Sequence, residues 1–354
     1  MKWISARFTG ACLASACLMA VSQAEAAPCM TVTITGSQGG PQAYQGQAGP
    51  GTLVSYGDDA NNCGAVRLQI DAGRGTILRL SQVNVLSSQV NAIFFTHMHN
   101  DHSEGFIDLV MHRWMIFPAA PKIDVVCSDD ATSPLGFVIS CKKFVAHIAD
   151  TMIQSGEIAQ RVGEDKRRLE GGPAAMTNLK TFEGKNEPQV VWTSGDVKVS
   201  AVRSTHIPGH ASYRVDTPAG SVVIGGDAGN DAFAPPRPSS TSAQVEALAR
   251  DADIIVHSTI HPVMGPDRDS GMPPPVFHRQ STASDLGAMA KRTGAKHLVL
   301  THLIPPPGAP NQGVWKVPGG ALTAADYTKA AQDGGFSGNV VVATDLATLR
   351  LPAK

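Results

Sequence analysis

The chain has 354 residues, of which 42% are hydrophobic and 17% charged, a composition ordinary for a folded protein of one large or two smaller domains. Its 29 basic and 30 acidic residues give a formal net charge of −1. This balance provides no basic surface for a nucleic-acid backbone, so we expect no nucleic-acid partner. No apolar run is long enough to predict a membrane span.

Residues 1–26 have the pattern of a signal peptide. Two basic residues precede a short apolar run at 11–21, and Ala24-Glu25-Ala26 follows as an A-x-A cleavage site. Two cysteines in this segment raise a lipoprotein alternative, but neither follows a convincing Leu-x-small triplet. We therefore expect cleavage near Ala26 and an exported product, periplasmic or secreted, that comprises residues 27–354.

Four cysteines remain after this cleavage: Cys29, Cys63, Cys127 and Cys141. In an oxidising compartment an even number suggests two disulfides, and four cysteines allow three connectivities. We favour Cys29–Cys63 and Cys127–Cys141, because each pair joins neighbouring segments; buried free thiols are the alternative. The cysteines lack the C-x-x-C spacing of a metal site.

Apolar periodicity predicts strands and helices along the whole chain. The strands are expected at 30–35, 52–56, 66–71, 91–95, 122–127, 188–192, 197–203, 221–225, 253–257 and 297–301. Helices are expected at 143–162, 242–250, 282–293 and 323–332, with N-caps at Ser242, Thr282 and Thr323 and C-caps at Gly294 and Gly334. The Pro- and Gly-rich stretches at 231–240, 262–275 and 303–320 read as long loops. This mixture predicts a single α/β domain over 27–354.

The segment Thr96-His97-Met98-His99-Asn100-Asp101-His102 carries the clearest chemistry. His97 and His99 are two residues apart and point to the same side of an extended chain. Asp101 and His102 follow where the chain should turn into a helix. Four nitrogen and oxygen donors within six residues suit zinc or a similar metal. A polar turn with satisfied histidines is the alternative, but so dense a pattern rarely arises that way.

Three further candidate ligands follow apolar strands elsewhere in the chain. His206 follows 197–203, Asp227 follows 221–225, and His302 follows 297–301. Each alone is typical of a surface or capping residue. Together with the histidine segment they complete two coordination spheres.

These seven residues, in this order, resemble the metal-binding pattern of the metallo-β-lactamase superfamily. Within it, the chain is most similar to the ribonuclease Z and arylsulfatase-like branch, on motifs that span roughly residues 30 to 305: Ile34–Gly40, Leu68–Thr76, Ser212–Arg214, Gly225–Asp227 and Leu298–His302. The resemblance implies a four-layer αβ/βα sandwich with the site at one edge, between the sheets.

The resemblance also implies how the ligands divide between two divalent metal ions, with zinc favoured. One ion would take His97, His99 and His206, the other Asp101, His102 and His302, and Asp227 would bridge them. Two such ions lie roughly 3.5–4 Å apart and lower the pKa of bound water to about 7. Because the site would be formally cationic, it suits an anionic ester.

Asp101 and His278 are the catalytic candidates. The branch carries a histidine directly before a Ser-Thr-Ala sequence, whereas here Arg279 and Gln280 stand between His278 and that sequence. His278 is a candidate general acid, and a surface histidine is the alternative. Where ribonuclease Z has His-Glu, this chain has His257 followed by serine, which argues against tRNA processing.

Other loop residues suggest substrate contacts. Arg237, Arg268 and Arg279 are candidates to hold an anion, and Trp315 and Phe277 are candidates to line an aromatic pocket; solvated surface is the alternative for each.

The leading hypothesis is an exported metal-dependent hydrolase of a small anionic ester, either an aryl sulfate or a phosphodiester, that uses a metal-bridging hydroxide. A lactonase or β-lactam hydrolase on the same site is the first alternative. A non-catalytic periplasmic metal- or ligand-binding protein is the second. The expected partner is the small ester alone, and the oligomeric state is left open.

Overall fold

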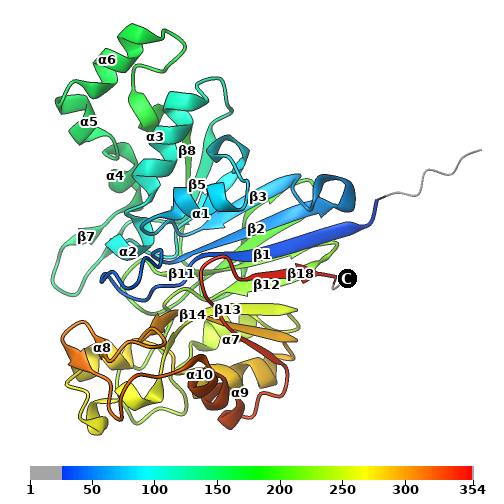
Figure 1. The fold of residues 1–354 in the computed structure, drawn as a ribbon, viewed down its shortest axis with the longest axis vertical. Helices are drawn as coiled ribbons and strands as arrows, with labels where there is room; N and C mark the ends of the chain where they lie inside the picture. Colours follow the sequence, from blue (N-terminus) through cyan, green and yellow to red (C-terminus); the bar gives the residue numbers. More distant parts are fainter. Residues whose placement is uncertain (1–25, 353–354) are drawn as a thin grey trace, which may run out of the picture.

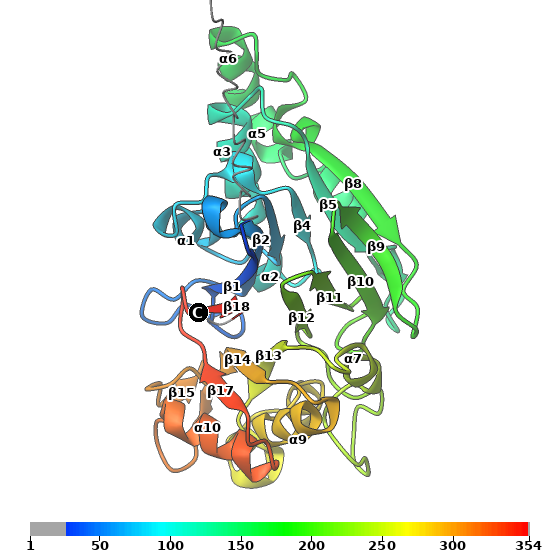
Figure 2. The ribbon, with the colours of Figure 1, turned by 90° about the vertical axis from the view of Figure 1, so that its right-hand side faces the viewer.

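The computed structural model describes residues 26–352, in which two seven-stranded sheets face each other (Figures 1 and 2). The predicted signal peptide therefore lies outside the described residues, apart from Ala26. The first sheet has the order β18 (Thr348–Leu351), β1 (Pro28–Gly36), β2 (Gly51–Asp58), β3 (Val66–Ile70), β4 (Ala92–Phe94), β5 (Ile123–Ser128) and β8 (Thr177–Phe182). The second has the order β17 (Asn339–Val342), β14 (His297–Ile304), β13 (Ile254–Ile260), β12 (Gly220–Ile224), β11 (Ala211–Thr217), β10 (Val197–Arg203) and β9 (Gln189–Ser194).

Helices cover the outer face of each sheet, as Figure 1 shows. Those of the first sheet are α1 (Thr76–Gln82), α3 (Phe106–Ile116), α4 (Cys141–Ala146), α5 (Asp150–Gln154) and α6 (Glu157–Glu164). Those of the second are α7 (Ala243–Leu248), α9 (Ala283–Thr293) and α10 (Ala324–Asp333), and the short helices α2 (Asn100–Ser103) and α8 (Pro274–His278) lie at one edge. The order helix, sheet, sheet, helix confirms the predicted four-layer αβ/βα sandwich.

Two small hairpins and five single 3₁₀ turns complete the described chain. The hairpins are β6 (Ala131–Thr132) with β7 (Val138–Ile139) and β15 (Asn311–Gln312) with β16 (Trp315–Lys316). The 3₁₀ turns cover Asp59–Asn61, Ser87–Gln89, Gly172–Met176, Pro262–Met264 and Pro266–Arg268. Among the described residues, no helix has the length and apolar character to cross a bilayer.

The main core lies between the two sheets. Phe94 of β4 and Tyr213 of β11 meet there with ring centroids 5.3 Å apart, and both side chains are fully buried. The Tyr213 hydroxyl donates a hydrogen bond of 2.7 Å to the Phe95 carbonyl, which leads directly into the histidine segment. This contact ties the end of β4 in one sheet to the other sheet.

The helix predicted at 143–162 is wrong as a single element, because the structure divides it into α4, α5 and α6. Ala149 leaves the helical region with φ −108° and ψ 3°, and Gly156 has φ +83°, which glycine adopts without a steric penalty. The other predicted helices are confirmed: Ser242, Thr282 and Thr323 each accept a hydrogen bond from a backbone amide three residues later.

Both predicted disulfides form, Cys29–Cys63 and Cys127–Cys141. The first joins the start of β1 to the turn after β2 across a separation of 34 residues. Cross-links of this kind act mainly by limiting the freedom of the unfolded chain.

We expect the double variant Cys29→Ser/Cys63→Ser to lose about 3–4 kcal/mol of unfolding free energy relative to the oxidised wild type. Urea titration followed by circular dichroism measures this difference. A reducing agent should lower the wild-type midpoint more than the variant midpoint, because the variant has only one cross-link left to lose. Equal midpoints for the oxidised wild type and the variant would contradict this expectation.

Candidate metal centre

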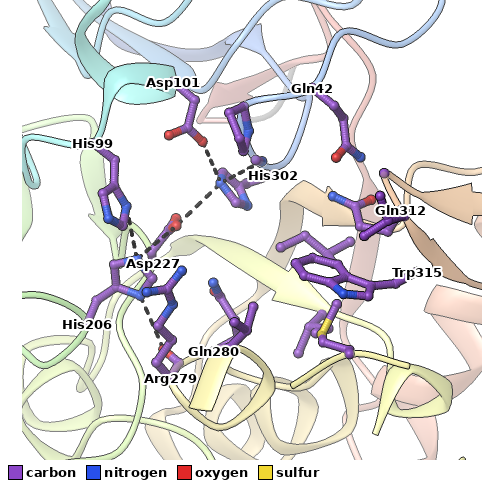
Figure 3. A pocket seen from close by; sticks show the side chains of 18 of the residues that line it. Gln42, His99, Asp101, His206, Asp227, Arg279, Gln280, His302, Gln312 and Trp315 are labelled. Carbon is purple, nitrogen blue, oxygen red and sulfur yellow. Dashed lines mark hydrogen bonds and ion pairs between the residues drawn. The ribbon is translucent and has the colours of Figure 1, made fainter. Parts of the chain in front are cut away.

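The seven predicted ligands meet at one edge of the sandwich because several strands end there. β10 and β12 both run antiparallel to β11, and β12, β13 and β14 are parallel, so β10, β12 and β14 point to the same edge. His206 and Asp227 follow β10 and β12, and His302 lies near the end of β14. β4 of the first sheet delivers the histidine segment to the same place, and Figure 3 shows ligands from both halves facing one another. Six of the seven side chains are buried, and His99 is half-buried.

The donor atoms form overlapping groups in which all atoms lie within 4.8 Å of one another. One group is His97, His99 and His206; another is Asp101, His102 and His302. Asp227 lies between them, with Oδ2 3.6 Å from His206 Nε2 and 3.3 Å from His302 Nε2. This is the division that the superfamily resemblance implies for two ions.

The chemistry of the donors fits divalent cations. His97 Nε2 lies 2.9 Å and His206 Nε2 3.3 Å from His99 Nδ1, so three imidazole nitrogens converge. A neutral imidazole has one donor and one acceptor nitrogen, so three converging nitrogens cannot all be paired with one another. His102 Nε2 and Asp227 Oδ1 are also buried without a hydrogen-bond partner among the described residues. A cation satisfies all these lone pairs at once.

The pKa shifts of the site residues also fit a site for divalent cations. Burial lowers the pKa of His206 to about 3, and burial also lowers the pKa of His97, so both rings are neutral, as metal ligands must be. Burial alone raises the pKa of Asp101, but His102 and His302 outweigh it and lower the value to about 2. Burial likewise lowers the pKa of His102, but Asp227, Asp101 and Asp71 together raise it well above its ordinary value. The buried carboxylates are therefore ionised and stabilise positive charge at this site, which bound metal ions would supply.

Asp71 is a functional residue that the sequence analysis missed. Its Oδ2 accepts a hydrogen bond of 2.9 Å from His102 Nδ1, and its two oxygens accept bonds of 2.8 Å from the Thr96 amide and hydroxyl. These contacts hold the proton of His102 on Nδ1 and turn Nε2 toward the site. The signal for Asp71 was its place in the motif Leu68–Thr76, at the end of β3.

His210 is also buried beside the ligands but serves a different purpose. Its Nε2 accepts a hydrogen bond of 3.2 Å from the Asp227 amide, and its Nδ1 lies 2.8 Å from the Ser204 hydroxyl. Both ring nitrogens are therefore engaged in hydrogen bonds, and Nε2 positions Asp227. This geometry leaves His206, and not His210, as the candidate ligand.

A β-bulge places His302. In the pairing of β13 with β14, Ser258 faces Thr301 and Thr259 faces Leu303, so His302 is the extra residue. Its φ of +46° is a rare conformation for a residue with a side chain, and such bulges redirect side chains beside active sites. Gly39 passes so close that a Cβ there would lie 2.7 Å from the His302 carbonyl oxygen.

A cavity of about 350 Å³ opens from the metal ligands. At one end it is lined by His99, Asp101, His206, Asp227 and His302; the rest has a mixed lining of Trp315, apolar residues and polar residues that include Gln42 and Gln312. Arg279 and Gln280 enter its wall, as Figure 3 shows. A cavity of this size and mixed lining suits a small ligand or one unit of a polymer.

The structure does not bring His278 to this cavity, in contrast to its predicted role as general acid. His278 is the last residue of α8, it is not among the residues of the described chain that line the cavity, and its carbonyl accepts a 2.8 Å hydrogen bond from Arg237. The residues that follow it, Arg279 and Gln280, turn into the cavity instead. The rotation of the chain at the end of α8 could not be read from the sequence.

His257 is a buried neighbour of the site. Its Nδ1 donates a 2.7 Å hydrogen bond to the Ser258 carbonyl, and its ring packs so closely on Gly225 that a Cβ there would lie 2.1 Å from His257 Cδ2. Burial lowers the pKa of His257 to about 4, from an ordinary value of 6.5.

This low pKa predicts a loss of stability in acid. Between pH 6.5 and pH 4 the unfolded chain binds a proton at His257 that the folded chain does not, so the unfolding free energy should fall as the pH falls through this range. The contribution of His257 is on the order of 3 kcal/mol. Urea titrations at pH 7 and pH 4.5 should show a smaller acid loss for His257→Gln than for the wild type or for the exposed control His147→Gln. An equal fall in unfolding free energy between pH 7 and pH 4.5 in all three proteins would contradict this role of His257.

Known proteins similar to this chain include ribonuclease Z and proteins of the metallo-β-lactamase fold. No protein-family model matches the chain. Ribonuclease Z of Mycobacterium bovis (strain BCG / Pasteur 1173P2) is 23% identical over 320 residues, which cover 90% of this chain and 96% of the relative. The metallo-β-lactamase fold protein YhfI from Bacillus subtilis has a TM-score of 0.58 at 18% identity and covers 91% of this chain and 99% of its own.

Two further solved structures share the fold. The short form of human tRNase Z has a TM-score of 0.57 at 16% identity, over 91% of this chain and 100% of its own. Zn²⁺-bound PqqB from Methylobacterium extorquens has a TM-score of 0.53 at 11% identity, over 90% of this chain and 99% of its own.

The fold and the relatives define a metallo-β-lactamase-fold enzyme, and the predicted class, a metal-dependent hydrolase of ester bonds, is confirmed. Within that superfamily the chain is similar to the ribonuclease Z branch, as the motifs indicated. The arylsulfatase-like part of the resemblance gains no support.

The predicted substrate and partner are wrong. The sequence predicts a small anionic ester and no nucleic acid, whereas a relative that matches across 90% of the chain is named for its action on RNA. The exclusion rested on a net charge of −1, which averages over the whole surface. A phosphodiester backbone needs positive charge only where it is bound, and metal ions at a recessed site can supply it.

Proposed function

We propose that this protein is a metal-dependent ribonuclease that hydrolyses a phosphodiester bond of RNA. The observation that carries the proposal is the match to ribonuclease Z across nearly the whole chain, combined with seven converging ligand side chains in a cavity. We further propose that the metal ions are two and that they are zinc, because the donors are imidazoles and carboxylates.

Each group of ligands has a defined task in this proposal. His97, His99 and His206 would hold one ion, Asp101, His102 and His302 the other, and Asp227 would bridge them. When bound, such ions provide hydroxide at neutral pH and polarise a phosphoryl oxygen. Asp101 also lines the cavity, and with a pKa of about 2 its carboxylate stays ionised and able to accept a hydrogen bond from the attacking water.

Arg279 supplies a fixed positive charge for the RNA phosphate. Burial is the main cause of the low pKa of His99 and His206, and the Arg279 guanidinium lowers both further, which places its charge beside the ligands. Its carbonyl lies 3.3 Å from His206 Nδ1, and its Nε is buried without a partner among the described residues. A guanidinium with free donors in a cavity is suited to a phosphate.

We expect Arg279→Ala to weaken RNA binding roughly 10- to 100-fold, the usual cost of losing a hydrogen bond to a charged group. The change should appear mainly in KM, because the phosphate is held before and during the reaction. Arg268→Ala is the matched control, since Arg268 is exposed, forms an ion pair with the neighbouring Asp267 and is not among the described residues that line the cavity. Equal KM values for the two variants would contradict this role of Arg279.

Purified protein loaded with zinc tests the proposed function directly. A 5′-labelled RNA hairpin with a single-stranded 3′ extension should be cut, and a chelator should stop the reaction. Failure to cut either this RNA or a single-stranded RNA, with metal bound, would reject the proposal.

Export stays a prediction. The two disulfides support an oxidising compartment. Cell fractionation, with amino-terminal sequencing of the recovered protein, would test both the compartment and the cleavage near Ala26.

A further inference from the structure

The cavity has a second end that metal binding does not explain. Opposite the ligands, its wall consists of Ile260, Met272, Val276, Ile304 and Trp315. The indole of Trp315 is half-buried and packs on one side against an apolar cluster that includes Ile260, Met272 and Ile304. Figure 3 shows this ring lying across the cavity from Asp227 and Arg279. The cavity therefore joins an anion-binding end to an aromatic end.

The small hairpin β15–β16 holds Trp315 in place. Trp315 pairs with Gln312 across a two-residue turn, in which Gly313 has φ +60°. Gln312 is buried, and its amide donates a 3.2 Å hydrogen bond to the Gly39 carbonyl beside His302. On the other side, the Lys316 amide donates a 3.1 Å hydrogen bond to the Ser270 carbonyl. The hairpin that carries Trp315 is thus anchored relative to the metal ligands, and the packing of the indole on the apolar cluster limits the entropy lost on binding.

We propose that this aromatic end binds the base of the nucleotide next to the scissile phosphate, stacked on Trp315. The inference rests on the proposed ribonuclease function and adds the part of the substrate that the cavity recognises. In RNA, the base is the group that combines a flat apolar face with a phosphate close by. Stacking on an aromatic side chain accepts any base, because every base has a π face. The site would therefore select for a nucleotide unit and not for one base identity.

Binding of mononucleotides tests this subsite apart from cleavage. Adenosine 5′-monophosphate and ribose 5-phosphate carry the same phosphate, but only the first has a base. Calorimetry on the zinc-loaded protein should show about tenfold tighter binding of the nucleotide. The nucleotide should also quench tryptophan fluorescence, because Trp315 is half-buried while Trp114 and Trp192 are buried.

Two variants separate stacking from packing. Trp315→Phe keeps a ring and should bind the nucleotide within about threefold of the wild type, whereas Trp315→Leu keeps apolar contact but should lose about tenfold. Leu135→Ala, at an exposed apolar residue that is not among the described residues lining the cavity, is the control. Equal binding of the two phosphates, or wild-type nucleotide binding by Trp315→Leu, would overturn the subsite.

The outcomes also distinguish the two proposals. If RNA is cut but the nucleotide and the sugar phosphate bind equally, the ribonuclease function stands and the base subsite fails. If the nucleotide binds through Trp315 but no RNA is cut, the subsite stands and the ribonuclease function fails.

Discussion

Asp227→Asn is expected to lower the rate of RNA cleavage by about three orders of magnitude or more, since it removes a charged ligand shared by both ions. Asp227 is buried and faces both ligand groups, at 3.6 Å from His206 Nε2 and 3.3 Å from His302 Nε2. Asparagine has nearly the same shape, so the fold should survive while the negative charge is lost. Cleavage rates at saturating RNA, with metal content measured on the same samples, check this expectation.

Asp216→Asn is the control for that experiment. Asp216 lies on β11 and pairs with Arg214 at 2.8 Å, away from the cavity. Its replacement should leave both cleavage and metal content unchanged. An Asp227→Asn protein that is folded and cuts RNA at the rate of this control would show that Asp227 is not a ligand of the reacting centre.

Asp71→Asn should weaken metal binding 10- to 100-fold, the usual effect of changing a residue that orients a metal ligand. A carboxylate only accepts hydrogen bonds, so Asp71 keeps the proton of His102 on Nδ1 and leaves Nε2 free as a ligand. Asparagine can donate instead, which permits the proton on Nε2, where it blocks coordination.

A competition titration with a chromophoric chelator measures this change in zinc affinity. Because Asp71 positions His102 and Thr96 and is not itself one of the proposed ligands, excess zinc should restore most of the cleavage rate of Asp71→Asn but not of Asp227→Asn. Unchanged zinc affinity in a folded Asp71→Asn protein would remove Asp71 from the site.

The layered fold could be predicted because its strands are apolar on both faces. β12, β13 and β14 lie between a helix layer and a second sheet, so nearly every residue in them is buried. Each contains a short apolar run, Val222–Ile224, Ile254–Val256 and Leu298–Leu300, by which it can be recognised. The prediction of a single helix at 143–162 was wrong because the spacing of its apolar residues is that of one continuous helix. The helix is interrupted at Gly156, whose backbone has φ +83°. A glycine can also occur inside a continuous helix, so its presence in the sequence does not show that the helix stops there.

The ligands of the candidate site could be predicted most easily where several of them lie close together in the sequence. The segment 97–102 carries four donors and needs no alignment to be noticed. His206, Asp227 and His302 could be proposed only from their places after apolar strands and from the order of the superfamily pattern. The shared direction of β10, β12 and β14 explains why they meet. Asp71 was missed because one aspartate at a strand end is an ordinary turn residue.

The loop residues were the least predictable. His278 and Arg279 are neighbours, yet only Arg279 lines the cavity, because the chain turns at the end of α8. The error about nucleic acid had another origin. A net charge describes the surface as a whole, whereas phosphate binding depends on a few charges at one recessed point.

The most direct test of the central claim is RNA cleavage by the zinc-loaded protein beside its Asp227→Asn variant, with the zinc content of each measured by elemental analysis. We expect about two zinc ions in each wild-type chain, a chelator-sensitive cut in the RNA hairpin, and loss of both zinc and cleavage in the variant. Wild-type protein that holds zinc through these ligands but leaves every RNA intact would contradict the account.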